Sequence, residues 1–304
     1  MKNKFFGLVM MVFVLVGLTG CSYFNKEDEG PIKVGLLLTS SPDNSYSEGA
    51  YGYSALKYLE SKYGVEIAYN ENVTNKDNAS YLLSSYGKNG FDLVVGIGSL
   101  FNEPMLNASE SYTDTQFVCI NGDKSEKNVT TYQLAEDDVS LLAGYIAGFL
   151  TKVDSIGYVV KDNTLYYSDS LAKGAKSVNN SIILDKYLVK NSGNYIDIVN
   201  SLSSKGDTAA VLFLTSKDLE NSLTGAGVKF LVVGGKAEPD AKFPVIAYNY
   251  NNIFERIFID FNTGNLKGKT VELGFKEGYI QVVSLEGLSS DVKIKVESLV
   301  KSFE

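Results

Sequence analysis

The stretch IKVGLLLTSSPDNSYSEGAYGYSALKYL, residues 32–59, combines a short apolar strand, a polar loop and an amphipathic helix. Residues 32–38 have the length and composition of a buried strand. The helix is expected from about Tyr46 to Tyr63, with its apolar residues on one face and Gly64 as its stop. A strand followed by a helix is the repeating unit of a mostly parallel sheet, so this stretch predicts an α/β protein.

The same unit recurs along the chain in two successive series. The first series ends with the helix that its pattern indicates most strongly, residues 136–152, and the second begins at Ser155. Two series predict two similar lobes, each built on a parallel sheet. The expected strands are residues 65–69, 93–97, 116–120, 156–160, 182–188, 209–214, 230–234 and 245–247, and the other expected helices are 78–86, 168–179, 195–204 and 218–225.

The C-terminal segment is expected to be shared between the lobes. Residues 253–261 predict a helix that crosses over, and 271–275 and 279–283 predict late strands. No linker rich in Pro, Gly or Ser divides the sequence, which favours lobes joined by several crossovers that move as a hinge. The predicted first lobe is 32–153 plus about 250–270, and the second is 154–249 plus about 271–304.

The N-terminus predicts an export signal with a lipidation site. Lys2 and Lys4 precede an apolar run from Phe5 to Val16, which is too short for a spanning helix of about 20 residues. The next residues, Leu18-Thr19-Gly20-Cys21, resemble a bacterial lipobox, in which Cys21 is diacylated and the chain is cut after Gly20. The alternative is an ordinary signal peptide with an accidental cysteine.

We therefore expect residues 1–20 to be a lipoprotein signal peptide and residues 21–31 to be a lipidated, flexible tether. The tether is polar and charged, with too little apolar content to offset the entropy of ordering it. Two acyl chains give the double anchor that stable membrane attachment needs. The predicted location is the extracytoplasmic face of the cell membrane.

Composition argues against several classes of function. Removing Lys2 and Lys4 with the signal takes the formal charge from −8 to −10, which disfavours nucleic acid as a partner. Histidine is absent, so the commonest general base and zinc ligand are missing. A glycosidase needs only two carboxylates, but no pair stands out here. We expect no enzyme activity, no metal and no cofactor, and a buried core thiol at Cys119.

Three segments are candidates for a binding site or for close packing. Ligands bind beyond the carboxyl ends of parallel strands, which favours the loop 39–47 with its hydroxyls, Asp43 and the ring of Tyr46. The alternative is a helix cap, with Asp43 or Ser45 accepting backbone N–H groups. Gly96-Ile97-Gly98 lacks the third glycine of a dinucleotide fingerprint and instead indicates a tight turn or close approach to a small ligand. Gly144 and Gly148 predict close packing of a buried helix on the sheet, since the stretch is too short for a membrane helix that dimerises.

These motifs together resemble one family. They are Leu141-Leu142-Ala143-Gly144-Tyr145-Ile146-Ala147-Gly148 with Thr151-Lys152, the loop Asp43-Asn44-Ser45-Tyr46-Ser47, and Gly96-Ile97-Gly98. The family is the BMP (basic membrane protein) family, the lipoprotein solute-binding components of ABC importers, and its best understood branch is similar to PnrA-type purine nucleoside receptors. The resemblance covers residues 32–283 and implies a type I periplasmic-binding fold of two Rossmann-like lobes with one ligand in the cleft between them.

The resemblance also implies site residues. Tyr46 takes the place of the family's base-stacking aromatic, and Ser47 that of the asparagine that follows it. Two family carboxylates fall on Asn121 and Asn249. The acidic residue of the first loop is replaced at best by Ser40. An amide keeps a carbonyl acceptor but adds a donor and removes the charge, which weakens hydrogen bonds to sugar hydroxyls.

The resulting expectation is a solute-binding lipoprotein that closes on a nucleoside-like molecule and passes it to an ABC permease. The ligand would contact Tyr46 by stacking, the backbone at Gly98 by close approach, and the polar residues Ser40, Asp43, Ser45, Ser47, Asn121 and Asn249. We expect a monomer. The alternative is a regulatory or sensory lipoprotein that keeps the fold without transporting a nucleoside, and the replaced acids motivate it.

Overall fold

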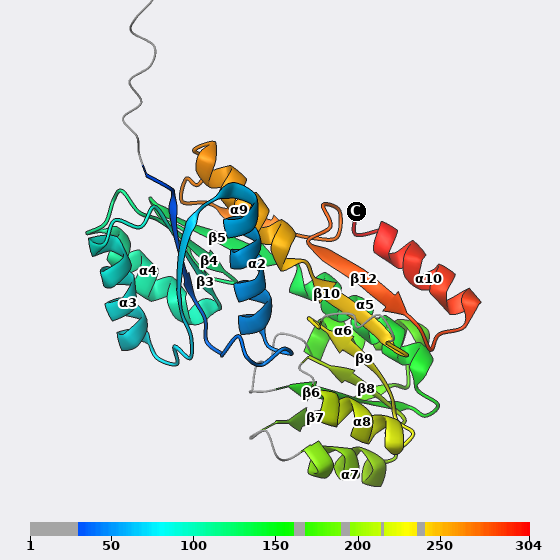
Figure 1. The fold of residues 1–304 in the computed structure, drawn as a ribbon. Helices are drawn as coiled ribbons and strands as arrows, with labels where there is room; N and C mark the ends of the chain where they lie inside the picture. Colours follow the sequence, from blue (N-terminus) through cyan, green and yellow to red (C-terminus); the bar gives the residue numbers. More distant parts are fainter. Residues whose placement is uncertain (1–29, 161–167, 190–194, 214–215, 236–240) are drawn as a thin grey trace, which may run out of the picture. The chain divides into compact units, whose positions relative to one another are not determined.

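The computed structural model describes residues 30–160, 168–189, 195–213, 216–235 and 241–304 (Figure 1). The predicted signal peptide, the lipidation site Cys21 and the tether up to residue 29 lie outside these residues. So do Leu214, the expected end of one strand, and its neighbour Thr215. Residues 33–304 form one unit of the chain. In the described part of the chain, no helix is long and apolar enough to cross a bilayer.

The first sheet has six strands in the order β11-β5-β4-β3-β1-β2, and all neighbouring pairs are parallel. Strand β1 lies inside this sheet with β2 and β3 on either side. Such a strand is buried on both faces, which explains its continuous apolar run. The strands are β1 (Lys33–Leu37), β2 (Glu66–Asn70), β3 (Leu93–Ile97), β4 (Gln116–Ile120), β5 (Val129–Leu134) and β11 (Thr270–Leu273).

The second sheet repeats this pattern with the order β12-β10-β9-β8-β6-β7. Its strands are parallel except for β12, which runs antiparallel to β10. The equivalent order in two sheets confirms the predicted α/β class with two similar, mostly parallel lobes. The strands are β6 (Ser155–Val160), β7 (Ile183–Leu188), β8 (Ala209–Leu212), β9 (Lys229–Val233), β10 (Pro244–Tyr248) and β12 (Ile280–Leu285).

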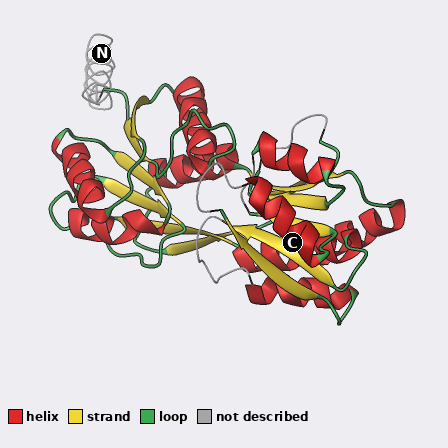
Figure 2. Ribbon diagram, turned by 90° about the horizontal axis from the view of Figure 1, so that it is seen from below, coloured by secondary structure: helices red, strands yellow, loops and turns green. Residues whose placement is uncertain are grey.

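Helices cover both faces of each sheet (Figures 1 and 2). One face of the first sheet packs on α3 (Lys76–Lys88), the 3₁₀ turn η1 (Ser99–Phe101) and α4 (Asn102–Ser109). Helices α2 (Glu48–Tyr63) and α9 (Tyr250–Asn262) pack against each other. One face of the second sheet packs on α5 (Glu136–Leu150), α6 (Ser168–Val178) and α10 (Ser290–Lys301), and the other on α7 (Tyr195–Lys205) and α8 (Lys217–Gly225).

Four of the described elements are absent from the sequence prediction: β5, α4, α10 and the 3₁₀ turn η1. Strand β5 has the sequence VTTYQL, and Thr130 and Thr131 are fully buried in it. Two adjacent hydroxyl residues interrupt the apolar run that marks other strands. Strand β5 follows β4 directly in the sequence and pairs with it in parallel, with no helix between them.

Two elements, α5 and β11, pack or pair with the sheet of the other lobe from the one predicted for them. The boundaries place residues 136–150 in the first lobe, whereas α5 packs its apolar residues against β6, β8 and β9 of the second sheet. They place residues from 271 on in the second lobe, whereas β11 pairs with β5 in the first sheet. The lobe boundaries themselves stay a prediction.

Within the described residues the chain passes three times between the first sheet with its helices and the second sheet with its helices, which are here called the two layers. It does so from β5 into α5, from β10 into α9, and from β11 into β12. Each passage starts at the carboxyl end of a strand. Neighbouring passages are hydrogen bonded, because the Ala135 N–H donates to the Leu273 carbonyl at 3.0 Å and the Asn249 N–H to the Tyr279 carbonyl at 2.8 Å.

Helices α5 and α6 touch backbone to backbone. A Cβ atom at Gly174 would collide with the carbonyl oxygen of Leu141, and one at Gly144 would collide with that of Leu171. At Gly148 a Cβ would lie 2.9 Å from the Cβ of Val178. The predicted close packing at Gly144 and Gly148 is therefore confirmed, but the predicted partner is wrong, because these glycines face helix α6 and not the sheet.

We expect Gly174→Ala to destabilise the fold by about 1–3 kcal/mol, because the added methyl group forces the two helix backbones apart. An alanine in a helix otherwise gains about 1 kcal/mol over glycine. The measurement is urea-induced unfolding followed by circular dichroism. Gly225→Ala is the matched control, since Gly225 ends α8 with open space around its Cα. Equal stability of the two variants would contradict the close helix contact.

Candidate functional site

The loop between β1 and α2 is held by its own hydroxyl groups. Ser47 is the N-cap of α2, and its Oγ accepts a hydrogen bond from the Ala50 N–H at 3.2 Å. The same hydroxyl donates to the Asn44 carbonyl at 2.8 Å. Ser40 Oγ accepts from the Gly49 N–H at 3.2 Å. Ser40 and Ser47 thus shape the loop and the start of the helix.

The other predicted residues of this loop lie nearer to solvent. Asp43 and Ser45 are exposed, and Tyr46 is half-buried, so its ring is not part of the core. The Tyr46 N–H donates to Asn44 Oδ1 at 3.2 Å, which fixes the backbone at the ring. The alternative in which Asp43 or Ser45 caps α2 is wrong, because Ser47 occupies that position.

Gly98 joins the end of β3 to its neighbours. Its φ angle is +113°, a region that favours glycine, and its N–H donates to the Ile120 carbonyl at 2.9 Å. A Cβ at Gly98 would lie 3.9 Å from Thr39, which places Gly98 beside the β1 loop. Gly96 serves packing, since a Cβ there would come within 2.8 Å of Phe101.

Asn121 directly follows β4 in the left-handed region, with φ +60°. Its Oδ1 accepts from the Leu134 N–H at 3.1 Å, and its Nδ2 donates to Glu136 Oε1 at 3.0 Å. The amide therefore binds both sides of the passage from β5 into α5. A carboxylate could not make the second of these bonds, because it has no donor.

Asn249 is the N-cap of α9, and its Oδ1 accepts from the Asn252 N–H at 3.2 Å. It stands in the passage from β10 into α9. Here only an acceptor is used, so an aspartate could replace it. The two asparagines that fall on family carboxylates thus have different local roles.

Sequence reasoning missed Tyr250 and Glu48, which the fold joins across 202 positions of sequence. The Tyr250 hydroxyl donates to Glu48 Oε1 at 2.8 Å, and the ring stacks on Tyr51 with centroids 6.3 Å apart. The ring of Tyr248 meets that of Tyr250 edge to face at 6.5 Å. The Tyr-Asn-Tyr sequence around Asn249 was the available signal for this aromatic group.

Electrostatics link Tyr250 to both sides of the candidate site. Tyr250 is 3% exposed, and burial, followed by the negative charge of Glu48, holds the pKa of its phenol well above the usual value. Glu136, the partner of Asn121, raises this pKa as well. The β1 loop, Gly98, Asn121 and Asn249 are thus brought to one region, at the carboxyl ends of strands.

Cys119 lies beneath this region and is fully buried. Burial raises the pKa of its thiol to about 12, so the thiolate form is suppressed near neutral pH. The predicted core thiol is confirmed. In the described ranges, no cluster of three or more Cys, Asp or Glu side chains is arranged to hold a metal ion.

A shallow hollow lies elsewhere, at the amino ends of β9 and β10. The rings of Phe230 and Phe243 meet in its lining with centroids 4.5 Å apart. None of the predicted site residues lines it. Its full lining is Thr224, Gly227, Val228, Lys229, Phe230, Lys242, Phe243 and Pro244.

Comparison with known proteins gives one family and several relatives. The family described as "ABC transporter substrate-binding protein PnrA-like" (Bmp) matches residues 33–201. The "Transcriptional activator protein med" of Bacillus subtilis (strain 168) is 26% identical over 316 residues, which cover 97% of this chain and 96% of that protein. The "ABC transporter nucleoside-binding protein BmpA" of Lactococcus lactis is 26% identical over 214 residues, which cover 66% and 58%.

A solved ABC transporter solute-binding protein from Aeropyrum pernix K1 has the same fold. The TM-score is 0.74 at 16% sequence identity, and the match covers 90% of this chain and 91% of that one. Since an activator and a solute-binding protein both match along most of the chain, the fold alone does not separate regulation from transport.

We expect Asn121→Asp to lower the free energy of unfolding by about 1–3 kcal/mol near neutral pH, because it removes a donor and sets a carboxylate against Glu136. Like charges raise the pKa of the new carboxyl group above its unfolded value. The loss should therefore shrink as the pH falls through that raised pKa and the group becomes protonated. Urea unfolding at about pH 7 and about pH 4.5 measures this.

Asn249→Asp is the matched control, because the acceptor for the Asn252 N–H is kept and a negative charge is favourable at a helix N-terminus. We expect its stability to be unchanged or slightly raised. Equal effects of the two substitutions would show that the Asn121 donor has no structural role.

Proposed function

We propose that this chain, which belongs to the Bmp family of PnrA-like ABC transporter substrate-binding proteins, is a lipid-anchored receptor that binds a nucleoside-like molecule outside the cytoplasm. The observation that carries the proposal is the position of Tyr46. Its half-buried ring stands just before α2, in the loop at the carboxyl end of β1, and Thr39 of the same loop lies beside Gly98. Parallel sheets bind their ligands at this edge.

The groups near Tyr46 suit a flat ring bearing a polar sugar. An aromatic face stacks on a base, and such pairs contribute about 0.5–1.5 kcal/mol beyond burial. Ser45 and Asp43 are exposed in the same loop and can bind hydroxyl groups. Backbone approach at Gly98 requires no side-chain movement. The name of the Lactococcus relative, a nucleoside-binding protein, supports this ligand class.

Asn121 and Asn249 can contribute less to such a site, because their side chains already form hydrogen bonds within the protein. Both side-chain amides bind backbone N–H groups, and Asn121 also binds Glu136. Sugar hydroxyls would therefore be bound by the spare lone pairs of these carbonyl oxygens, without the charge that family carboxylates supply. We expect weaker binding than two carboxylates would give.

Regulation is the second candidate. The Bacillus subtilis relative that covers 97% of the chain is named a transcriptional activator, and the two amides in place of acids fit a receptor that has changed its ligand. Deleting the gene separates the two functions. A transport receptor is needed for uptake of the labelled ligand, whereas a regulator changes expression of other genes while uptake continues.

The lipid anchor predicts that Cys21 decides where the protein is found. In the native host, wild type should partition into the detergent phase of a Triton X-114 extract, because two acyl chains are attached. We expect Cys21→Ser to abolish acylation and move the protein into the aqueous phase. Mass spectrometry of the N-terminal peptide checks the modification. An unmodified Cys21 in the wild type would exclude the anchor.

The ligand class predicts heat on titration of residues 22–304 with a panel of purine and pyrimidine nucleosides. Tyr46→Ala should weaken binding by roughly 3- to 10-fold, since the stacking energy is lost, whereas Tyr46→Phe should bind as wild type does. Isothermal calorimetry gives both numbers. No heat with any nucleoside at millimolar concentration would eliminate nucleosides as the ligand.

A further inference from the structure

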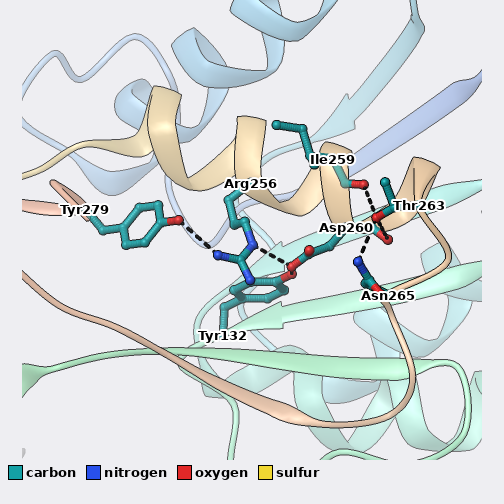
Figure 3. Close-up of polar contacts among 7 residues, drawn as sticks. All are labelled: Tyr132, Arg256, Ile259, Asp260, Thr263, Asn265 and Tyr279. Atoms are coloured by element: carbon teal, nitrogen blue, oxygen red, sulfur yellow. Dashed lines mark hydrogen bonds and ion pairs between the residues drawn. The ribbon is translucent and has the colours of Figure 1, made fainter. Parts of the chain in front are cut away.

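The sequence contains one arginine, Arg256, and the structure places it on α9 among the passages between the two layers. Figure 3 shows its guanidinium between Asp260 and the hydroxyl of Tyr279. Arg256 Nε donates to Asp260 Oδ2 at 2.7 Å, and Nη1 donates to the Tyr279 hydroxyl at 3.3 Å. A guanidinium holds its donors in a rigid planar fork, whereas each of the 27 lysines of this chain has a compact ammonium group with rotatable donors on a flexible stem.

The two partners of Arg256 are linked to different sheets, although Asp260 itself lies on α9. Asp260 also accepts a hydrogen bond from the Tyr132 hydroxyl at 2.6 Å, and Tyr132 lies on β5 of the first sheet. Asp260 is 4% exposed and Tyr132 is fully buried. Tyr279, by contrast, directly precedes β12 of the second sheet. One donor of Arg256 therefore binds Asp260, which is bonded to a buried tyrosine of the first sheet. The other donor binds Tyr279, at the start of a strand of the second sheet (Figure 3).

The bond to Tyr279 acts on two passages at once. The Tyr279 carbonyl accepts from the Asn249 N–H at 2.8 Å, and Asn249 is the N-cap of α9. A rotation that moves β12 relative to α9 would also move the Tyr279 hydroxyl, because Tyr279 directly precedes β12. The Asp260 and Tyr132 pair is unaffected, since both residues stay with the first sheet.

The two bonds of Arg256 differ in strength. The bond to Asp260 is short and charge-assisted, and breaking it would leave a buried carboxylate without its cation. The bond to Tyr279 is longer and has a neutral acceptor. The Arg256 side chain is 36% exposed, so water can solvate the donor that Tyr279 releases. The contact with Tyr279 is the one that can open.

We propose that Arg256 is a latch between the two sheets, and that its bond to Tyr279 limits how far the second sheet rotates away from the first. In the proposed receptor this rotation opens and closes the binding site. The inference rests on the proposed function for the purpose of the rotation, but not for the existence of the latch. The latch itself is a property of the protein without ligand.

The test is a distance measurement by double electron–electron resonance on residues 22–304. Spin labels are attached at Lys88→Cys on α3 and Asn200→Cys on α7, two exposed positions that pack with different sheets. The native thiol at Cys119 is buried and will not be labelled. We expect one narrow distance distribution with Arg256 and Tyr279 intact, and a broader distribution shifted to longer distances in Tyr279→Phe.

Tyr63→Phe is the matched control. It also removes one tyrosine hydroxyl bonded to α9, at 2.5 Å from Glu255, but its helix α2 packs with α9 rather than with the second sheet. Its distribution should equal that of the unsubstituted chain. Arg256→Lys keeps the charge beside Asp260 but lacks the planar fork that reaches both Asp260 and Tyr279. It should reproduce Tyr279→Phe, which keeps the test open if that variant folds poorly.

An unchanged distribution in both Tyr279→Phe and Arg256→Lys would overturn the latch, and so would an equal change in Tyr63→Phe. No ligand is added in these measurements. Failure of the latch is therefore distinguishable from failure of nucleoside binding, which the calorimetric titration detects.

Discussion

Two sheets of parallel strands can be joined without breaking their ladders only at strand ends, and this constraint organises the molecule. All three described passages leave from the carboxyl end of a strand: β5, β10 or β11. The loops that bind ligands in parallel sheets also lie at carboxyl ends. The candidate site and the connections between the layers therefore share one edge, and residues such as Asn121 and Asn249 belong to both.

Polar side chains at that edge are bound to one another, in contrast to the apolar interior of each sheet. Asn121 forms hydrogen bonds to the residues on both sides of one passage. Tyr250 binds Glu48. Arg256 binds both Asp260 and Tyr279. Hydrogen bonds of this kind are directional, so they favour one arrangement of the backbone over many similar ones. Hydrophobic packing alone has no such directionality. This is why the junction carries the charged and phenolic groups.

The sequence predicts the elements whose apolar runs are uninterrupted. Strand β1, helix α2 and helix α5 lie close to their expected positions because each has a continuous buried face. Strand β5 could not be predicted in the same way, since Thr130 and Thr131 are polar and their burial depends on neighbours that are distant in the sequence. Helix α5 was expected with the first lobe. Its glycines predict a close contact, but the partner of that contact, α6, follows another strand in the sequence and no local pattern specifies it.

The candidate site could be predicted in part. The loop 39–47 is found from its position after the first strand. The cap was not predicted correctly, because the sequence offers several hydroxyl and carboxylate side chains there and the structure uses Ser47 in place of Asp43 or Ser45. The pairing of Tyr250 with Glu48 joins residues 202 positions apart and has no local signal. The same applies to Asn121, whose partner Glu136 follows a strand that the sequence did not reveal.

The backbone contact of α5 with α6 has a practical consequence. At Gly144 and Gly174 the two helix backbones touch with no side chain between them to repack, so we expect the helices to move as a single rigid piece with the sheet they cover. A fluorophore attached to the exposed side of α6 would then report displacement of that whole half and not local fraying. The helix is a suitable attachment point for turning this chain into an optical sensor of its own ligand.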